Sequence, residues 1–335
     1  MGLGQEAARN LTKAGNFGLS RSTWSNYGTA ERMLHKCRKE TKKKLELPLE
    51  QADVLTFVEW LIRVRKAKHG TISSYLAGLR QLHQLQGHQD TQIRTELVNL
   101  VLAGRRNQET LEKKRDHKKS RLPVTQNVMR LIKATLRESQ LETGEKLLTW
   151  TVSCLAFNGA FRIHELLSRE ETRFDPRTTL LTEDINIVRD QMSGKEVIVV
   201  KLKWPKESRA GKEVDVEVFE TGSEICPVKA IKKWWAYSGK GEKGLPAFRT
   251  ENGKAWTGKK FNERLHQLLG KHFDYKTGSI TSHSFRSGVT TTLGQAGFSD
   301  GDLKQVGRWS SRAFESYLKL PRTKRREMAT AIGNL

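Results

Sequence analysis

The chain has 335 residues, of which 36% are hydrophobic, and its formal net charge is +23. That length allows about two domains, and the charge indicates an anionic partner, of which nucleic acid is the simplest. The three cysteines, Cys37, Cys154 and Cys226, are scattered, which argues against a disulfide framework or a zinc cluster. Because no long apolar run and no signal peptide are present, we expect no membrane partner and an intracellular protein.

Residues 1–112 are expected to form a bundle of four or five helices. Apolar residues recur at helical spacing from Trp24 onward and over residues 54–62, 72–82 and 93–101, with polar residues or glycine between these stretches. Cations and hydroxyl groups gather where the second stretch ends and the third begins: Lys66, Lys68, Thr71, Ser73 and Ser74. A helix N-terminus with such neighbours suits a phosphate, but a solvated helix cap explains the same residues equally well.

Residues 113–122 are predicted to be a basic linker. The cations of this linker are Lys113, Lys114, Arg115, Lys118, Lys119 and Arg121. Such a run is typical of a disordered segment, and the same segment can bind a DNA backbone by displacing counterions. A second domain is expected over residues 123–320, beginning with an amphipathic helix over residues 124–136.

The periodicity changes to two between residues 183 and 219. Val200 and Leu202 alternate with Lys201 and Lys203, and a second stretch alternates valine with acidic residues over 213–218. Two half-buried strands joined by the turn PKESRAGK predict a β-hairpin with Lys206 in its loop. A lysine at a hairpin tip is ordinarily just solvated.

The C-terminal stretch brings together residue types that suit a phosphate. His283 and Arg286 are three positions apart and share one face of a helix, where an imidazole and a guanidinium can both donate hydrogen bonds. The turn AGFSDGD, the sequence Gly307-Arg308-Trp309-Ser310-Ser311 and finally Tyr317 follow. Taken singly, each residue has an ordinary explanation as an exposed helix face or as packing.

Together, this order of motifs resembles the tyrosine recombinase (phage-integrase-like) superfamily, and Arg162 with Glu165 matches the upstream motif that the resemblance requires. The resemblance covers residues 123–320, and over the N-terminal bundle it is architectural only. It implies a mainly α protein: a helical core-binding bundle plus a mixed α/β catalytic domain with a small antiparallel sheet. The sequences GRWSS and ICPVKAI resemble eukaryotic mobile-element members of DIRS, Ngaro or Crypton type.

The resemblance also implies roles for the site residues. Tyr317 attacks a DNA phosphodiester and forms a 3′-phosphotyrosine bond, and Lys206 protonates the leaving 5′-oxygen, with Lys203 and Lys201 as alternatives. The charge on the phosphate is stabilised by Arg162, Arg286, His283 and Trp309, with Glu165 supporting Arg162. Many members carry a second histidine where either Arg308 or Trp309 stands here. No cofactor and no metal are implied.

We therefore expect a site-specific recombinase or integrase of a mobile element that acts on double-stranded DNA as a homotetramer pairing two sites, in the nucleus if the source is eukaryotic. Residues 321–335 are expected to form a C-terminal helix that docks either on a neighbouring subunit or back on the subunit to which it belongs. The alternatives are a type IB topoisomerase-like enzyme and a non-catalytic DNA-binding protein derived from a transposase.

Overall fold

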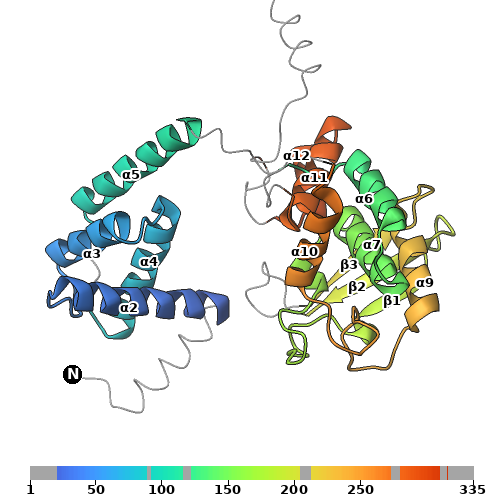
Figure 1. Cartoon of the computed structure of the whole chain (residues 1–335), viewed down its shortest axis with the longest axis horizontal. Helices are drawn as coiled ribbons and strands as arrows, with labels where there is room; N and C mark the ends of the chain where they lie inside the picture. Colours follow the sequence, from blue (N-terminus) through green and yellow to red (C-terminus); the bar gives the residue numbers. More distant parts are fainter. Residues whose placement is uncertain are drawn as a thin grey trace, which may run out of the picture. The chain divides into compact units, whose positions relative to one another are not determined.

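The computed structural model describes residues 21–88, 92–115, 122–203, 213–272, 280–309 and 315. The chain divides into two compact units, Met1–Lys118 and Lys119–Leu335 (Figure 1). This division falls within the predicted linker, whose first three residues are helical because they end helix α5 (Glu96–Arg115). No helix in the described ranges is long and apolar enough to cross a membrane.

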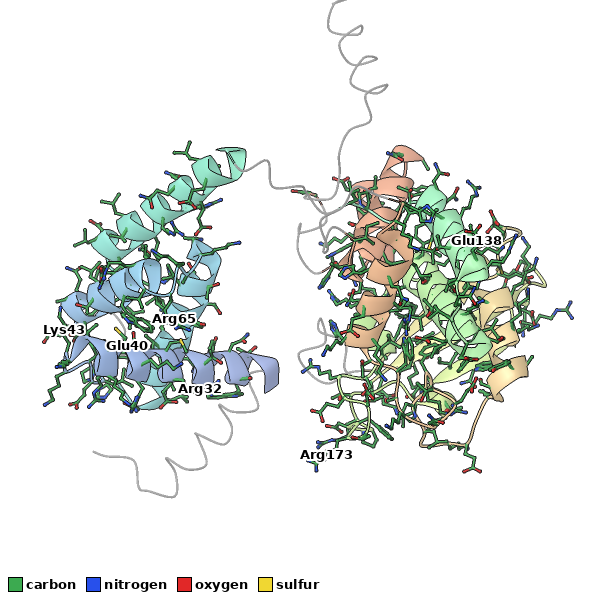
Figure 2. The ribbon with its side chains drawn as sticks, viewed as in Figure 1. Arg32, Glu40, Lys43, Arg65, Glu138 and Arg173 are labelled. Carbon is green, nitrogen blue, oxygen red and sulfur yellow. The ribbon has the colours of Figure 1, made fainter. Side chains whose placement is uncertain are left out.

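The first unit is helical, as predicted. It contains α2 (Arg21–Thr41), α3 (Gln51–Arg63), α4 (His69–Leu85) and α5. Trp60 of α3 is fully buried, donates from its indole nitrogen to Glu40 on α2, and has the guanidinium of Arg65 6.0 Å from its ring centre. Glu40 and Arg65 are both labelled on this unit in Figure 2. The indole therefore joins two helices by packing and by a hydrogen bond.

The buried face of α5 differs from the prediction. We expected Ile93, Leu97, Leu100 and Val101 to share the apolar face of a helix. Ile93 is buried but precedes the helix, and Val101 packs partly buried against the core, whereas Leu97 and Leu100 are 44% and 69% exposed. The buried residues are Val98 and Leu102, which are also four apart. Because both sets have helical spacing, packing on α3 and α4 decides which face is buried.

The second unit is an α/β domain, and the predicted fold class is confirmed. Its helices and strands are α6 (Gln126–Glu138), α7 (Thr143–Asn158), α8 (Ile163–Leu166), η1 (Thr182–Asp184), β1 (Ile185–Arg189), β2 (Glu196–Leu202), β3 (Val214–Phe219), α9 (Pro227–Ser238), α10 (Gly258–Leu269), α11 (His283–Gln295) and α12 (Asp300–Val306). The sheet is antiparallel in the order β1-β2-β3, with Val200 opposite Val216. The hairpin prediction matches β2 and β3, and β1 adds a third strand.

Helix α7 lies at the centre of the second unit. Ten of its sixteen residues are buried, which suits a helix that packs against α6, α9 and α11. Figure 1 shows α6 and α7 side by side. Helix α11 is fixed against the start of α6 because the Val124 amide donates to the Ser284 carbonyl at 2.8 Å. A Cβ on Gly288 would overlap the Val124 carbonyl, so the two segments approach closely.

Candidate active site

Arg162 stands between the end of α7 and the start of α8. Helix α7 stops at Asn158, whose side-chain Nδ2 donates to the carbonyl of Cys154 in the last turn of the helix. Ala160 then adopts a left-handed conformation with φ 46°, which turns the chain sharply. Arg162 is the N-cap of α8, and its backbone amide donates to Glu165 at 2.8 Å. The helix start therefore fixes the Cα position of Arg162.

Glu165 is a buried carboxylate shared by two arginines. Its Oε1 accepts from Arg162 Nη1 at 2.9 Å, and its Oε2 accepts from Arg308 Nη2 at 2.8 Å. Its side chain is only 4% exposed, and burial alone raises the pKa of this carboxyl. The charge of Arg308 and then the hydrogen bonds and charge of Arg162 outweigh burial, so the pKa of Glu165 lies below its ordinary value. Glu165 is therefore ionised at neutral pH.

The His283 and Arg286 motif opens α11. His283 is the first residue of the helix and is exposed, whereas Arg286 is 4% exposed. Arg286 Nη2 donates to the carbonyl of Gly307, and its guanidinium carbon lies 4.6 Å from the ring centre of Trp309. The two C-terminal motifs, His-x-x-Arg and Gly-Arg-Trp, therefore meet through Arg286.

Arg308 and Trp309 make different contacts although they are adjacent in sequence. The Arg308 guanidinium reaches back to the Gly159 carbonyl at 3.0 Å, binds Glu165 and covers the Phe161 ring at 5.0 Å. The Trp309 ring instead lies over Gly307, where a Cβ would overlap it. Of the two candidates for the second-histidine position, Trp309 is the one that contacts Arg286.

The arrangement of the fold is shared with solved structures. No protein-family model matches the sequence, and no curated protein matches it. The Tn1549 transposon integrase in complex with transposon right-end DNA superimposes with a TM-score of 0.59 at 14% identity, over 97% of this chain and 98% of that chain. The XerH site-specific recombinase bound to palindromic difH substrate gives 0.55 at 13% identity, over 89% and 75%. A lambda integrase dimer bound to a COC′ core site gives 0.50 at 14% identity, over 92% and 75%.

This chain has the tyrosine-recombinase fold. The likeness concerns the course of the backbone, since identities of 13–14% carry no information on single residues. The likeness of fold covers 97% of this chain in the comparison with the Tn1549 transposon integrase, so it includes the N-terminal bundle.

The hairpin lysines of this tyrosine-recombinase fold have distinct surroundings. Lys203 Nζ lies 2.8 Å from the buried carboxylate of Asp184, and Lys201 Nζ lies 3.6 Å from Glu213 across the hairpin. Lys206, the first choice for the leaving-group proton, lies outside the described residues, as does Tyr317. Both therefore stay predictions from the sequence.

His164 is a residue near the site that sequence reasoning did not select. It stands between Arg162 and Glu165 on α8 and is exposed. Partial desolvation lowers the pKa of His164, Glu165 opposes this shift, and the charges of Arg162, Arg169 and His283 add to it. The imidazole is therefore predominantly neutral at pH 7. Its only signal in the sequence is its place inside the Arg162–Glu165 motif.

The predicted phosphate contacts of the first unit surround the start of α4. Lys66, Lys68, Thr71 and Ser74 are exposed there, and Ser73 is half-buried beside the His69 ring. The side chains of Lys113, Lys114, Arg115, Lys118, Lys119 and Arg121 lie outside the described part of the chain. Unexpectedly, the Glu109 carboxylate of α5 accepts the His69 backbone amide, so a protein group already occupies the α4 N-terminus.

A pocket of about 450 Å³ lies between the start of α4 and α5. It is lined by polar and cationic side chains that sequence reasoning missed, among them Arg94, Asn99, Arg106 and Asn107. No single helical pattern links Arg94 and Arg106, because Arg94 precedes α5 and Arg106 lies on it. Only the folded bundle brings these two guanidinium groups to one surface.

Proposed function

We propose that this chain is a site-specific DNA recombinase that cuts and rejoins DNA through a 3′-phosphotyrosine intermediate. One observation carries the proposal. The Gly307–Trp309 turn contacts both arginine-bearing elements, because Arg286 donates to Gly307 and packs on Trp309, while Arg308 shares Glu165 with Arg162. Tyr317 follows this turn in the sequence. The shared fold and the net charge of +23 also support the proposal.

In this proposal, Tyr317 is the nucleophile and the new phosphotyrosine ester conserves the energy of the broken phosphodiester, so rejoining needs no external energy source. Arg162 and Arg286 hold non-bridging phosphate oxygens as negative charge develops, with His283 and the Trp309 indole N–H as further donors. Glu165 keeps the Arg162 fork in one orientation. A guanidinium already fixed by a buried carboxylate needs little reorganisation when the charge appears.

Lys206 is the proposed general acid for the departing 5′-oxygen. Its two rivals already have partners: Lys203 is held by Asp184, and Lys201 faces Glu213. An ammonium fixed in an ion pair with a buried carboxylate is poorly placed to reach a leaving group. The Asp184 contact therefore counts against Lys203, whereas the Lys201 pair with Glu213 is exposed and leaves Lys201 as an alternative.

We further propose that the chain serves a mobile element of DIRS, Ngaro or Crypton type. The support is the GRWSS and ICPVKAI sequences. Recombination joins two DNA sites, so the working form is proposed to be a homotetramer, with residues 321–335 as a contact between subunits. If the source is eukaryotic, the protein acts in the nucleus.

The test is covalent capture from a library of duplexes with a randomised segment, followed by SDS treatment and sequencing of the DNA that stays attached. The wild-type chain should form SDS-resistant adducts in the presence of EDTA, and Tyr317→Phe should bind the same duplexes without forming them. Equal adduct from the Phe variant contradicts the proposal. A selected duplex placed in supercoiled plasmids then separates recombination between two sites from relaxation by a single protomer, which is the topoisomerase alternative.

A further inference from the structure

We propose that Arg308 is a positioning residue of this site, which acts on Arg162 through the shared carboxylate of Glu165 and fixes the turn that carries Trp309. The proposal rests on the proposed function, because it assigns Arg308 a part in DNA cleavage. It also answers a question that counting along the sequence leaves open. Arg308 is one of the two candidates for the second-histidine position, but its guanidinium is committed to the protein.

The contacts of Arg308 all lead to the segment that presents Arg162. Nη1 donates to the Gly159 carbonyl at 3.0 Å, and Nη2 donates to the Ala160 carbonyl at 3.5 Å and to Glu165 Oε2 at 2.8 Å. The guanidinium plane also covers Phe161. One side chain therefore binds Gly159, Ala160, Phe161 and Glu165, which lie on both sides of Arg162. A planar guanidinium suits this because its donors form a rigid fork.

The backbone at both ends of this contact adopts a conformation that is costly for residues with a side chain. Ala160 has φ 46° and Arg308 has φ 51°, and such left-handed residues persist only when their surroundings hold them. The Arg308 side chain bonds to the Ala160 carbonyl, so each strained turn is held by the other. Residues in such conformations cluster at sites where a side chain must be aimed.

Charge gives Arg308 a second effect on Arg162. With Arg162 as its only partner, Glu165 would form a neutral pair and reduce the positive potential available to a phosphate. Two guanidinium groups on one carboxylate leave a net positive charge. The groups that face Glu165 are Arg162 and His164 on its own helix and Arg308 from the turn after α12. Arg308 therefore keeps Glu165 ionised and keeps the site cationic.

The kinetic test compares Arg308→Met with wild type in single-turnover cleavage at saturating DNA. The variant should cleave about 10²-fold more slowly, since a displacement of ~1 Å has such effects, and saturating DNA keeps any change in affinity out of the measured rate. Glu165 loses a cation, its pKa rises, and the acid limb of the pH–rate profile should move to higher pH. The double variant Arg308→Met with Glu165→Gln should be less slow than the product of the two single effects, because both variants disturb Arg162 through one carboxylate.

The matched control is Arg264→Met. Arg264 on α10 forms an ion pair with Glu145 in the same unit and is partly buried, with its side chain 28% exposed against 15% for Arg308, but it contacts none of the site residues named above. Its loss tests for general destabilisation and should leave the pH–rate profile unchanged. If Arg264→Met moves the profile as Arg308→Met does, or if Arg308→Met keeps the wild-type profile, the proposal is wrong.

Two further measurements keep the test decisive. If Arg308→Met does not fold, Arg308→Lys replaces it. Lysine keeps the positive charge, so the pH–rate profile should stay unchanged. One ammonium cannot bind both carbonyls and Glu165 as a guanidinium does, so cleavage should slow. Wild-type speed in Arg308→Lys contradicts the proposal. Carboxyl-labelled glutamate NMR, with the Glu165 signal identified by its absence in Glu165→Gln, follows the titration without any cleavage. If wild type forms no adduct, the proposed function fails, whereas an unchanged Glu165 titration in the Arg308 variant refutes the contact itself.

Discussion

The guanidinium carbon of Arg286 lies 4.6 Å from the ring centre of Trp309, and the same guanidinium donates to the carbonyl of Gly307. A cation over an indole ring is attracted to the π-electron face, and burial strengthens that attraction. The contact joins α11 to the turn after α12, and Tyr317 follows that turn in the sequence. We therefore expect the rate of DNA cleavage to depend on the position of the Trp309 ring.

Gly307→Ala should displace the Trp309 ring. Gly307 has φ −81°, which alanine adopts without cost, but a Cβ would overlap the ring. The ring must move, and a shift of ~1 Å at such a site can slow cleavage by about 10²-fold. Single-turnover adduct formation measures the effect. Gly301→Ala is the control, because its Cβ would meet only Ser299 Oγ at 3.5 Å. Equal rates in the two variants would show that the ring position is unimportant.

Lys206→Ala should lower the rate of cleavage, whereas Lys203→Ala should lower the stability of the fold. The first removes the proposed general acid and should slow cleavage by about 10²–10⁴-fold, with recovery on a substrate whose leaving 5′-oxygen is replaced by sulfur. The second leaves the buried Asp184 without its cation and should cost about 1–3 kcal/mol of unfolding free energy. Lys201→Ala removes an exposed pair and should change stability by less than about 1 kcal/mol. Sulfur rescue of Lys203→Ala alone would move the acid to Lys203.

Gly288→Ala should destabilise the second unit. Its Cβ would overlap the Val124 carbonyl, and a rigid backbone atom cannot move aside as a flexible side chain does. Overpacking of this kind costs about 1–3 kcal/mol, which denaturant unfolding measures. Gly104→Ala on α5 is the opposite control: a Cβ there meets open space, so alanine should stabilise that helix by about 0.5–1 kcal/mol. Destabilisation by both substitutions would refute the packing argument.

Arg106→Gln should reduce the salt dependence of DNA binding if the pocket beside α4 holds a phosphate. The slope of log K against log salt concentration should become shallower by about 0.9 for each lost contact. Arg63→Gln, which removes a largely exposed i,i+4 partner of Glu59 in the same unit, should leave the slope unchanged. Binding isotherms at several salt concentrations make the comparison. An unchanged slope for Arg106→Gln would mean that this pocket does not contact the DNA backbone.

Local pattern was sufficient for much of the second unit. The sequence predicted α6 by its apolar spacing and the β2–β3 hairpin by its period of two. Each of these signals comes from residues within one helix or one hairpin. Leu97 and Leu100 of α5 were wrongly predicted to be buried for the same reason. Apolar residues on two sides of one helix are equivalent until other helices pack on it.

The sequence by itself determined which side chains carry chemistry and the short spacings that group them, as in Arg162 with Glu165 and His283 with Arg286. Tertiary structure alone decided that Arg308 turns inward to Glu165 while Trp309 packs on Arg286, and that Glu109 occupies the start of α4. Arg308 and Glu165 are 143 positions apart. Whether such residues meet depends on how helices pack around a common core, and no local periodicity encodes that.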